Sequence, residues 1–362
     1  MQQMLDDDSL ISVLIVDDSA VIRGVIRRWI ERDAELKVIA AAANGRDAVA
    51  LARRYQPDVV ILDIEMPELD GLDALPLIKK VAPEAAVVMA SAMTKRNAEI
   101  SLRALRRGAA DYIPKPDTRG RAATSDEFRD EIIAKIKALG RRALTGRQEQ
   151  SFMQKLLVKK TQQRPVTRLK PKILAIGAST GGPQALFELM SNLPGDFKLP
   201  IVITQHMPKT FTGIFADHLA RISGRDVKEA QDGDIVRPDM VYLAPGDCHM
   251  TFERVGYQVQ VKLDGGPKEN FCRPSVDPMF RSVAKIYGKQ VLSVVLTGMG
   301  HDGRDGAKYI KDAGGRCIAQ DAETSVVWGM PGAVVKAGLC DAVLPLPQIA
   351  PYVQQIMIGE AA

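Results

Sequence analysis

Short apolar runs alternate with amphipathic segments along the first 140 residues of the chain. Segments with apolar residues at helical spacing lie near 20–32, 45–55, 71–81 and 95–107. The apolar runs are ISVLIV (11–16), LKVIAA (36–41), DVVIL (58–62), AAVVMA (85–90) and ADYI (110–113). Apolar strands joined by helices favour a parallel sheet covered by helices on both faces. The pattern therefore predicts an α/β domain of five βα units over residues 10–140, closed by a helix at 126–139.

The same alternation resumes in the second half of the chain. Its apolar runs are KILAI (172–176), PIVIT (200–204), MVYLA (240–244), QVLSVVLT (290–297) and RCIAQ (316–320). Residues 251–263, TFERVGYQVQVKL, instead alternate like the two strands of a hairpin. We therefore expect a second doubly wound, mostly parallel α/β domain over 171–362, with an antiparallel hairpin.

The composition is that of a globular protein with two cores. The chain has 362 residues, of which 46% are hydrophobic and 26% charged, and this length is natural for two domains. No apolar run reaches the roughly 18 residues of a membrane span. The first residues, MQQMLDDDSL, are acidic where a signal peptide is basic. We expect a cytoplasmic protein without direct membrane insertion.

The cysteines do not form a metal-binding pattern. Cys248, Cys272, Cys317 and Cys340 show no CxxC pairing, which argues against a zinc site and fits reduced thiols inside a cell. Cys248 and His249 are adjacent, and neighbours in an extended segment point to opposite faces. This pair is therefore not expected to form a catalytic dyad.

The net charge of +5 is concentrated in one segment. Residues 119–172 hold fifteen Lys/Arg and five Asp/Glu, a net charge of +10. A basic stripe can bind nucleic acid or acidic lipid. This one has almost no aromatic residues and no helix-turn-helix pattern beside it. We interpret residues 141–170 as a solvated basic linker and expect no nucleic-acid partner, although salt-dependent duplex binding would support the alternative.

Polar side chains gather at the carboxyl ends of the predicted strands of the first domain. Asp17 and Asp18 follow the first strand, Asp63 the third, Ser91 the fourth and Lys115 the fifth. Helix capping could explain the first aspartates by themselves. Together, a group of carboxylate oxygens suits Mg²⁺, and an aspartate beside Mg²⁺, an ammonium and a hydroxyl can accept a phosphoryl group.

With these residues in place, residues 10–140 resemble a response-regulator receiver domain, which has a flavodoxin-like fold. The resemblance implies that Asp63 is phosphorylated. It also implies that Asp17, Asp18 and Asp63 hold Mg²⁺ together with the backbone carbonyl of Glu65.

The resemblance assigns further roles around the phosphoryl group. Ser91 and Lys115 would contact its oxygens, and Tyr112 matches the aromatic switch position. The Lys115-Pro116 bond matches one that is usually cis. Pro76, inside the third predicted helix, costs helix stability unless it falls in the first turn.

The second domain begins with the stretch KILAIGASTGGPQALFELM, residues 172–190. An apolar run followed by small residues and a helix pattern suits either a phosphate cradle or a nucleophile. A dinucleotide fingerprint needs G-x-G-x-x-G, whereas the middle glycine here is Ser179. Residues 177–181 fit G-x-S-x-G, a turn that lifts a serine hydroxyl above a sheet edge.

Two other strand ends could supply the partners of this serine. His206 follows one strand in QHMP, and Asp302 follows another in TGMGHDG. A serine nucleophile needs a base, and the base needs a third group that fixes its tautomer. The three strand ends could provide all three groups.

The residues alone do not select the histidine. His218 lies in a helix pattern, where we expect a surface side chain. His249 follows a strand end in APGDCHM, where structural support is the simpler role. His301 directly precedes Asp302 and is expected at the rim of the site.

A resemblance selects among these alternatives. GASTGG, QHMP, YLAPGDCHM, RPSVDPMF and LTGMGHDG occur in the order found in chemotaxis protein-glutamate methylesterases, from about residue 172 to 350. With the receiver in front, the whole chain resembles the CheB family. The order Ser–His–Asp differs from that of α/β-hydrolases, so that fold is not expected.

The family resemblance implies a role for each motif. Ser179 is the nucleophile, His206 the general base and Asp302 the carboxylate that orients it. Thr180 assists near the serine, and the backbone N–H of Met299 helps to stabilise the oxyanion.

The implied reaction is hydrolysis of glutamate γ-methyl esters on chemoreceptors through an acyl-enzyme, with deamidation of glutamine as a second activity. It needs no cofactor, and a chemotaxis histidine kinase would be the phosphodonor of the first domain. The resemblance also implies that the unmodified receiver covers the serine cleft until Asp63 is phosphorylated. A nucleotide-binding output domain is the rival interpretation, which bound nucleotide in the purified protein would favour.

Overall fold

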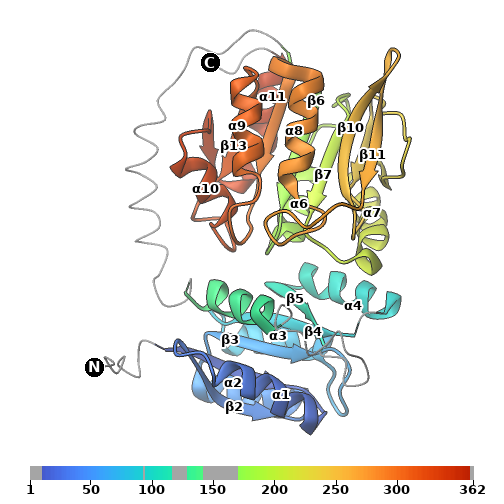
Figure 1. The fold of residues 1–362 in the computed structure, drawn as a ribbon. Helices are drawn as coiled ribbons and strands as arrows, with labels where there is room; N and C mark the ends of the chain where they lie inside the picture. Colours follow the sequence, from blue (N-terminus) through green and yellow to red (C-terminus); the bar gives the residue numbers. More distant parts are fainter. Residues whose placement is uncertain (1–9, 93, 116–128, 142–169, 359–362) are drawn as a thin grey trace. The chain divides into compact units, whose positions relative to one another are not determined.

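The chain divides into two compact units, Met1–Gly146 and Arg147–Ala362. The computed structural model describes residues 10–92, 94–115, 129–141 and 170–358, and Figure 1 shows their helices and strands. Most of the predicted linker, 141–170, therefore lies outside the described residues.

The first unit contains a five-stranded parallel sheet, as predicted. Its strands lie in the order β2-β1-β3-β4-β5. They are β1 (Ile11–Val16), β2 (Leu36–Ala42), β3 (Val59–Asp63), β4 (Ala86–Ser91) and β5 (Asp111–Pro114). The central strand β3 is buried along its whole length, because helices cover both faces of the sheet.

Four helices of this unit begin at a polar side chain that caps them. They are α1 (Ala20–Ile30), α2 (Gly45–Tyr55), α3 (Gly71–Val81) and α4 (Lys95–Arg106). The caps Ser19, Asn44, Asp70 and Thr94 each accept a hydrogen bond from the backbone N–H three residues on. Each cap satisfies a donor that the first turn leaves unpaired, which fixes where the helix starts.

Pro76 lies past the first turn of α3, so the helix lacks one backbone hydrogen bond. The carbonyl left without that donor belongs to Leu72, four residues earlier. The guanidinium of Arg107 donates to this carbonyl at 3.3 Å. A side chain from beyond α4 therefore compensates for the proline, and the helix continues to Val81.

The helix predicted to close the unit is present at residues 129–141. A side chain at Gly140 would clash with Ile11, so this helix packs directly on β1. Lys137 pairs with Asp33 at 3.1 Å and with Glu35 at 2.6 Å. These ion pairs fasten the helix to the segment between α1 and β2.

The second unit contains a seven-stranded sheet with strand order β14-β13-β12-β6-β7-β9-β8. All its pairs are parallel. The strands are β6 (Ile173–Ala178), β7 (Ile201–Gln205), β8 (Asp226–Glu229), β9 (Met240–Leu243), β12 (Val291–Val295), β13 (Arg316–Gln320) and β14 (Ala342–Leu344). The sequence prediction missed the two edge strands, β8 and β14.

The predicted hairpin forms a separate two-stranded antiparallel sheet of β10 (His249–Val255) and β11 (Gln258–Asp264). The helices are α6 (Gly182–Asn192), α7 (Lys209–Ser223), α8 (Val276–Tyr287), α9 (Arg304–Asp312), α10 (Met330–Lys336) and α11 (Leu346–Ile358), with a short 3₁₀ helix, η3 (Gly288–Gln290). Helix α6 packs on α7 and α11, while α8 packs on α9, which lies in front of the sheet in Figure 1.

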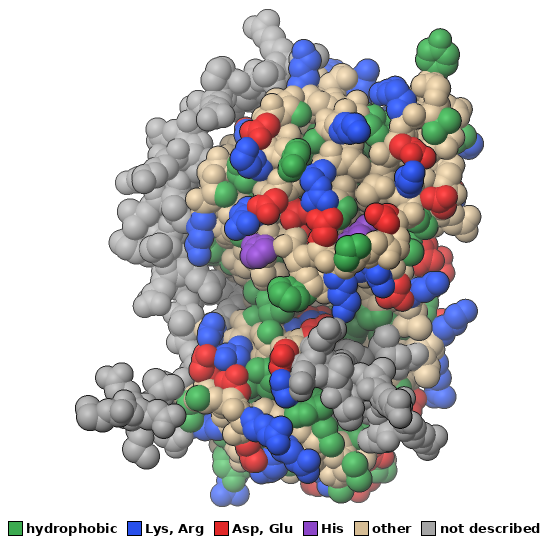
Figure 2. Space-filling model, viewed as in Figure 1, with side chains coloured by type: hydrophobic (Ala, Val, Ile, Leu, Met, Phe, Trp, Pro, Cys, Tyr) green, Lys and Arg blue, Asp and Glu red, His purple; other side chains and the backbone are tan. Residues whose placement is uncertain are grey.

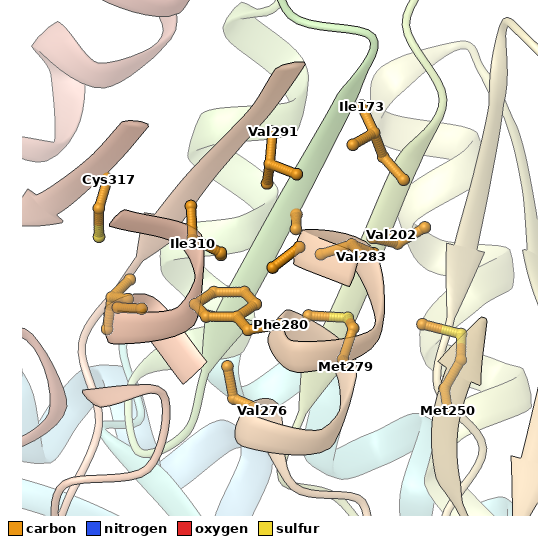
Figure 3. Close-up of a cluster of buried hydrophobic side chains, with 14 of the residues drawn as sticks. Ile173, Val202, Met250, Val276, Met279, Phe280, Val283, Val291, Ile310 and Cys317 are labelled. Carbon is orange, nitrogen blue, oxygen red and sulfur yellow. The ribbon is translucent and has the colours of Figure 1, made fainter. Parts of the chain in front are cut away.

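The core around α8 joins the main sheet to the hairpin. Figure 3 shows Phe280 and Met279 of α8 between Val291 of β12, Val202 of β7 and Met250 of the hairpin strand β10. All five side chains are almost completely buried. Burial of apolar side chains of this size contributes about 1.5–3 kcal/mol each, so this core fixes the start of α8 relative to the sheet.

Candidate functional sites

The predicted acidic site of the first unit is assembled as expected. Asp17, Asp18 and Asp63 each bring a carboxylate oxygen within 4.8 Å of the others. Asp17 directly follows β1, Asp63 ends β3, and both are buried. The Lys115 ammonium lies 3.0 Å from Asp17 Oδ2 and 2.6 Å from Asp63 Oδ2.

Burial and neighbouring charges together change the pKa of the Asp63 carboxyl. Burial and, more weakly, the neighbouring Asp17 raise the pKa of Asp63, while Lys115 lowers it, and the pKa settles at about 6. Several carboxylates with only one ammonium among them keep a net negative charge, which a further cation would neutralise. Their oxygen donors are those that Mg²⁺ prefers, so the residues fit the metal.

Ser91 lies in β4, Tyr112 lies in β5, and Glu65 follows β3 by two residues. Ser91 ends β4 beside Asp63, and its hydroxyl donates to backbone carbonyls of Ala92 and Asn97. Tyr112 is buried in β5, and burial raises the pKa of its phenol. The backbone N–H of Glu65 donates to Asp63 Oδ1 at 3.3 Å. Pro116 lies outside the described residues, so the expected cis bond is not described.

In the second unit, the structure brings Ser179, His206 and Asp302 together. Ser179 follows β6, His206 follows β7, and Asp302 lies beyond β12. These strands are neighbours, because β6 pairs with β12 on one side and with β7 on the other. The strand order reverses at β6, and in open parallel sheets such a switch point is where binding crevices form.

The three side chains form a hydrogen-bonded row. Ser179 Oγ lies 3.1 Å from His206 Nδ1, and His206 Nε2 lies 2.7 Å from Asp302 Oδ2. Burial by itself would lower the pKa of His206, but Cys272 and Asp302 outweigh it and raise the pKa. Burial would raise the pKa of Asp302, but the hydrogen bond from His206 and several others hold it below its usual range. In the neutral form of His206, an ionised Asp302 keeps the one ring proton on Nε2 and leaves Nδ1 to accept from the serine.

Asp302 is held by further donors that sequence reasoning did not find. Its Oδ1 accepts from the Ser275 hydroxyl at 2.7 Å and from the Asn270 amide at 2.9 Å. Two backbone N–H groups at the start of α8 also donate to this carboxylate, that of Val276 to Oδ2 at 2.6 Å and that of Asp277 to Oδ1 at 3.1 Å. These contacts fix the plane of the carboxylate and therefore the direction of the His206 ring.

Two glycines let the backbone pass close to the serine. Gly181 has a φ of +74°, and a side chain there would lie 2.4 Å from Val326. A Cβ on Gly298 would lie 2.8 Å from Ser179 Cβ, so the loop that carries Met299 presses against the nucleophile. Contacts within the domain therefore require both glycines.

The remaining histidines divide as follows. His249 is buried, accepts from the backbone N–H of Ser275 through Nδ1 and contacts the Pro267 carbonyl at 2.9 Å through Nε2. This is the structural support expected of it. His301 is exposed, as a rim position requires. The prediction that His218 lies on the surface was wrong: it is only 8% exposed, on the face of α7 that also buries Phe215.

Besides the donors to Asp302, two more residues of this site were not anticipated. The Cys272 sulfur lies 3.3 Å from His206 Nδ1, the nitrogen that faces Ser179. The Gln205 amide donates to the backbone carbonyls of Ser179 and His206 at 2.9 and 3.1 Å. Gln205 ends β7 beside the predicted base, so its position next to His206 could have suggested this role. No sequence signal placed Cys272 there.

Among the helices that the structure describes, none is both long and apolar enough to cross a bilayer. The fold and the two sites define a class of protein: a receiver domain joined to an α/β domain with a serine–histidine–aspartate row. Residues 174–353 match the family model of the CheB methylesterase, and residues 13–124 match that of the response regulator receiver domain.

Known proteins place the chain within that class. It is 47% identical to protein-glutamate methylesterase/protein-glutamine glutaminase 1 of Paramagnetospirillum magneticum, over 96% of each chain. It is 48% identical to the protein of the same name from Rhodospirillum rubrum, over 95% of this chain and 94% of that one. The crystal structure of the Thermotoga maritima CheB methylesterase catalytic domain matches with 44% identity and a TM-score of 0.51, covering 52% of this chain and all of that one. The chain belongs to the CheB methylesterase family.

Proposed function

We propose that this chain hydrolyses glutamate γ-methyl esters on chemoreceptors and deamidates glutamine at the same site. The names of its relatives, protein-glutamate methylesterase/protein-glutamine glutaminase, support both activities. The observation that carries the proposal is the row from Ser179 through His206 to Asp302, with separations of 3.1 and 2.7 Å.

The proposed reaction has two steps. Ser179 Oγ attacks the γ-carbonyl carbon while its proton passes to His206 Nδ1, and the resulting imidazolium is stabilised by Asp302. The imidazolium then gives this proton to the departing methoxide, so methanol leaves and an acyl-enzyme remains. Water attacks the acyl group with His206 again as base, which releases glutamate. With glutamine as substrate, ammonia leaves in place of methanol.

Stabilisation of the oxyanion is assigned to groups around the serine. The loop that carries Met299 lies against Ser179, which favours a role for its backbone N–H. The Thr180 hydroxyl is buried beside the nucleophile and has no hydrogen-bond partner among the described residues. A contact with the reacting group would satisfy this hydroxyl.

Regulation is assigned to Asp63. Asp17, Asp18, Asp63 and the carbonyl of Glu65 would hold Mg²⁺, which offsets negative charge on the incoming phosphoryl group. Lys115 and Ser91 would then contact the phosphoryl oxygens, with Tyr112 as the switch residue. A chemotaxis histidine kinase is the proposed phosphodonor, and the proposed location is the cytoplasm.

The direct test is methanol release from a methylated receptor, with and without acetyl phosphate and Mg²⁺. We expect release that increases with the phosphodonor and falls by on the order of 10⁶-fold in S179A. Release by S179A within tenfold of the wild type would rule out Ser179 as the nucleophile. A purified protein with bound nucleotide and no release would favour the rival nucleotide-binding function.

A further inference from the structure

A tight turn beside the triad holds an aromatic residue in an unfavourable backbone conformation. Glu269 and Cys272 exchange backbone hydrogen bonds of 3.1 and 2.9 Å across the two residues between them. Those residues, Asn270 and Phe271, have φ angles of +51° and +65°. Positive φ at both central positions is the pattern of a type I′ turn, which favours asparagine first and glycine second. Phe271 stands where glycine is preferred.

The turn is held in place by hydrogen bonds to side chains of α8 and to Asp302. The Arg281 guanidinium of α8 binds both carboxylate oxygens of Glu269, at 2.6 and 2.9 Å. The Asn270 amide donates to Asp277 Oδ2 at 2.8 Å and to Asp302 Oδ1 at 2.9 Å. Such bidentate and charge-assisted bonds fix geometry strongly. The turn is therefore anchored to the same carboxylate that orients the catalytic base.

The side chain of Phe271 takes part in none of these hydrogen bonds. Its neighbours on both sides touch the triad, Asn270 at Asp302 and Cys272 at His206. Phe271 itself is 95% exposed, so no packing within the described residues offsets its left-handed backbone. Strain of this kind concentrates at functional sites, where surrounding structure holds it in place.

We propose that Phe271 is a docking residue for the protein substrate, and that it inserts against apolar side chains next to the glutamyl ester. This proposal rests on the proposed function and adds how the substrate is recognised. Because the turn already fixes the backbone that carries Phe271, only the rotamer freedom of its side chain is lost on binding. Buried aromatic anchors of this type contribute much of the affinity at protein interfaces.

The surface of the second unit favours substrate docking through one exposed aromatic side chain, because it shows no broad apolar area in the face that is viewed. Figure 2 shows charged side chains of both signs interspersed over the viewed face of the second unit, with isolated hydrophobic side chains between them. Among the described residues of this unit, the most exposed aromatic residue is Tyr257, at the tip of the β10–β11 hairpin. It makes no contact with the triad residues in the described structure, so it serves as a matched control.

The test compares two substrates on the full chain activated with acetyl phosphate and Mg²⁺. The first is methylated receptor, and the second is the γ-methyl ester of N-acetylglutamate, which carries the ester but none of the receptor's apolar side chains. We expect F271A to lower kcat/KM for the receptor about tenfold or more relative to the small ester, mainly through a higher KM. F271W should restore activity on the receptor, and Y257A should change neither substrate.

F271G adds a readout that separates docking from structure. Glycine relieves the left-handed strain, so this variant should unfold at a higher temperature than the wild type while still binding the receptor poorly. Equal losses on both substrates in F271A, or an unchanged KM for the receptor, would overturn the proposal. A wild-type protein that hydrolyses neither substrate would instead refute the proposed function itself.

Discussion

Asp302 accepts a 2.6 Å hydrogen bond from the backbone N–H of Val276, the first residue of helix α8. The carboxylate that faces His206 therefore also caps a helix. The positive end of the helix dipole stabilises an anion at this point, in addition to the individual hydrogen bonds. Catalytic geometry and the start of α8 thus depend on one side chain.

The first prediction concerns D302N. Asparagine offers one acceptor oxygen and presents N–H groups where a second acceptor is needed, so both the His206 tautomer and the helix cap are lost. We expect kcat to fall on the order of 10⁴-fold, as in related triads, and the free energy of unfolding to fall by about 2 kcal/mol. Methanol release and thermal unfolding would check both, with S179A as an inactive control of normal stability. Unchanged stability in D302N would contradict the capping role.

The second prediction compares two histidines. H206A removes the proposed base and should be nearly as inactive as S179A. H249A removes only the contacts to Ser275 and Pro267, so activity should fall far less while stability decreases. Initial rates and unfolding temperatures of the two purified variants would check this. The assignment fails if H249A proves the less active of two folded proteins.

The third prediction concerns phosphorylation. D63N should not form the acyl phosphate, because an amide replaces the accepting carboxylate and gives Mg²⁺ less charge. Mass spectrometry after treatment with acetyl phosphate and Mg²⁺ would detect the adduct on the wild type. Adding a chelator should abolish it. A full-level adduct on D63N would locate the site elsewhere.

The fourth prediction is a pH dependence from Asp277. Burial, and then the nearby Asp302, raise the pKa of Asp277 to about 6, above its usual value. The folded state therefore binds more protons than the unfolded state between about pH 4 and 6, and stability is lost as pH rises through this window. D277N removes the titration. The difference in unfolding free energy between the two proteins should move on the order of 2 kcal/mol in favour of the wild type from pH 7 to 4.5. Parallel stability curves would contradict it.

The fifth prediction concerns regulation by the receiver. A fragment that starts near Pro171 should release methanol faster than the unphosphorylated full chain, and acetyl phosphate should not affect it. The catalytic domain of the Thermotoga maritima protein, which is 44% identical to this chain where the two match, was solved as a separate domain. Rates for the fragment, the full chain and the phosphorylated full chain would be compared. A fragment slower than its unphosphorylated parent would exclude inhibition by the receiver.

Periodicity predicted the central strands of both sheets because they are buried and strongly apolar. The edge strand β8 was missed because its residues, DVKE, are mostly polar, and β14 was missed because it has only three residues. Their pairing comes from neighbouring strands in the folded sheet, which local sequence does not report. His218 was misplaced for a similar reason: its polarity indicated the surface, although it shares the buried helix face with Phe211 and Phe215.

The triad could be found from strand ends and motif order, whereas most of its support could not. Ser275 and Asn270 reach Asp302 from about thirty residues away in the chain, and Cys272 reaches His206 from 66 residues away. Ser275 lies in the motif RPSVDPMF, which could have suggested it, but hydrogen-bonding side chains occur in every loop and nothing local marks Asn270 or Cys272. Only the packing of α8 against the sheet brings them to the site.

The arrangement of β12, β6 and β7 has a consequence for folding. Ser179, His206 and Asp302 each follow one of these strands, and β6 must pair with both neighbours before the three can meet. Pairing between β6 and β12 spans more than a hundred residues of chain, and such long-range contacts form slowly. During refolding, helical signal should therefore recover ahead of esterase activity. The return of esterase activity would then mark the time at which β6 has paired with both β7 and β12.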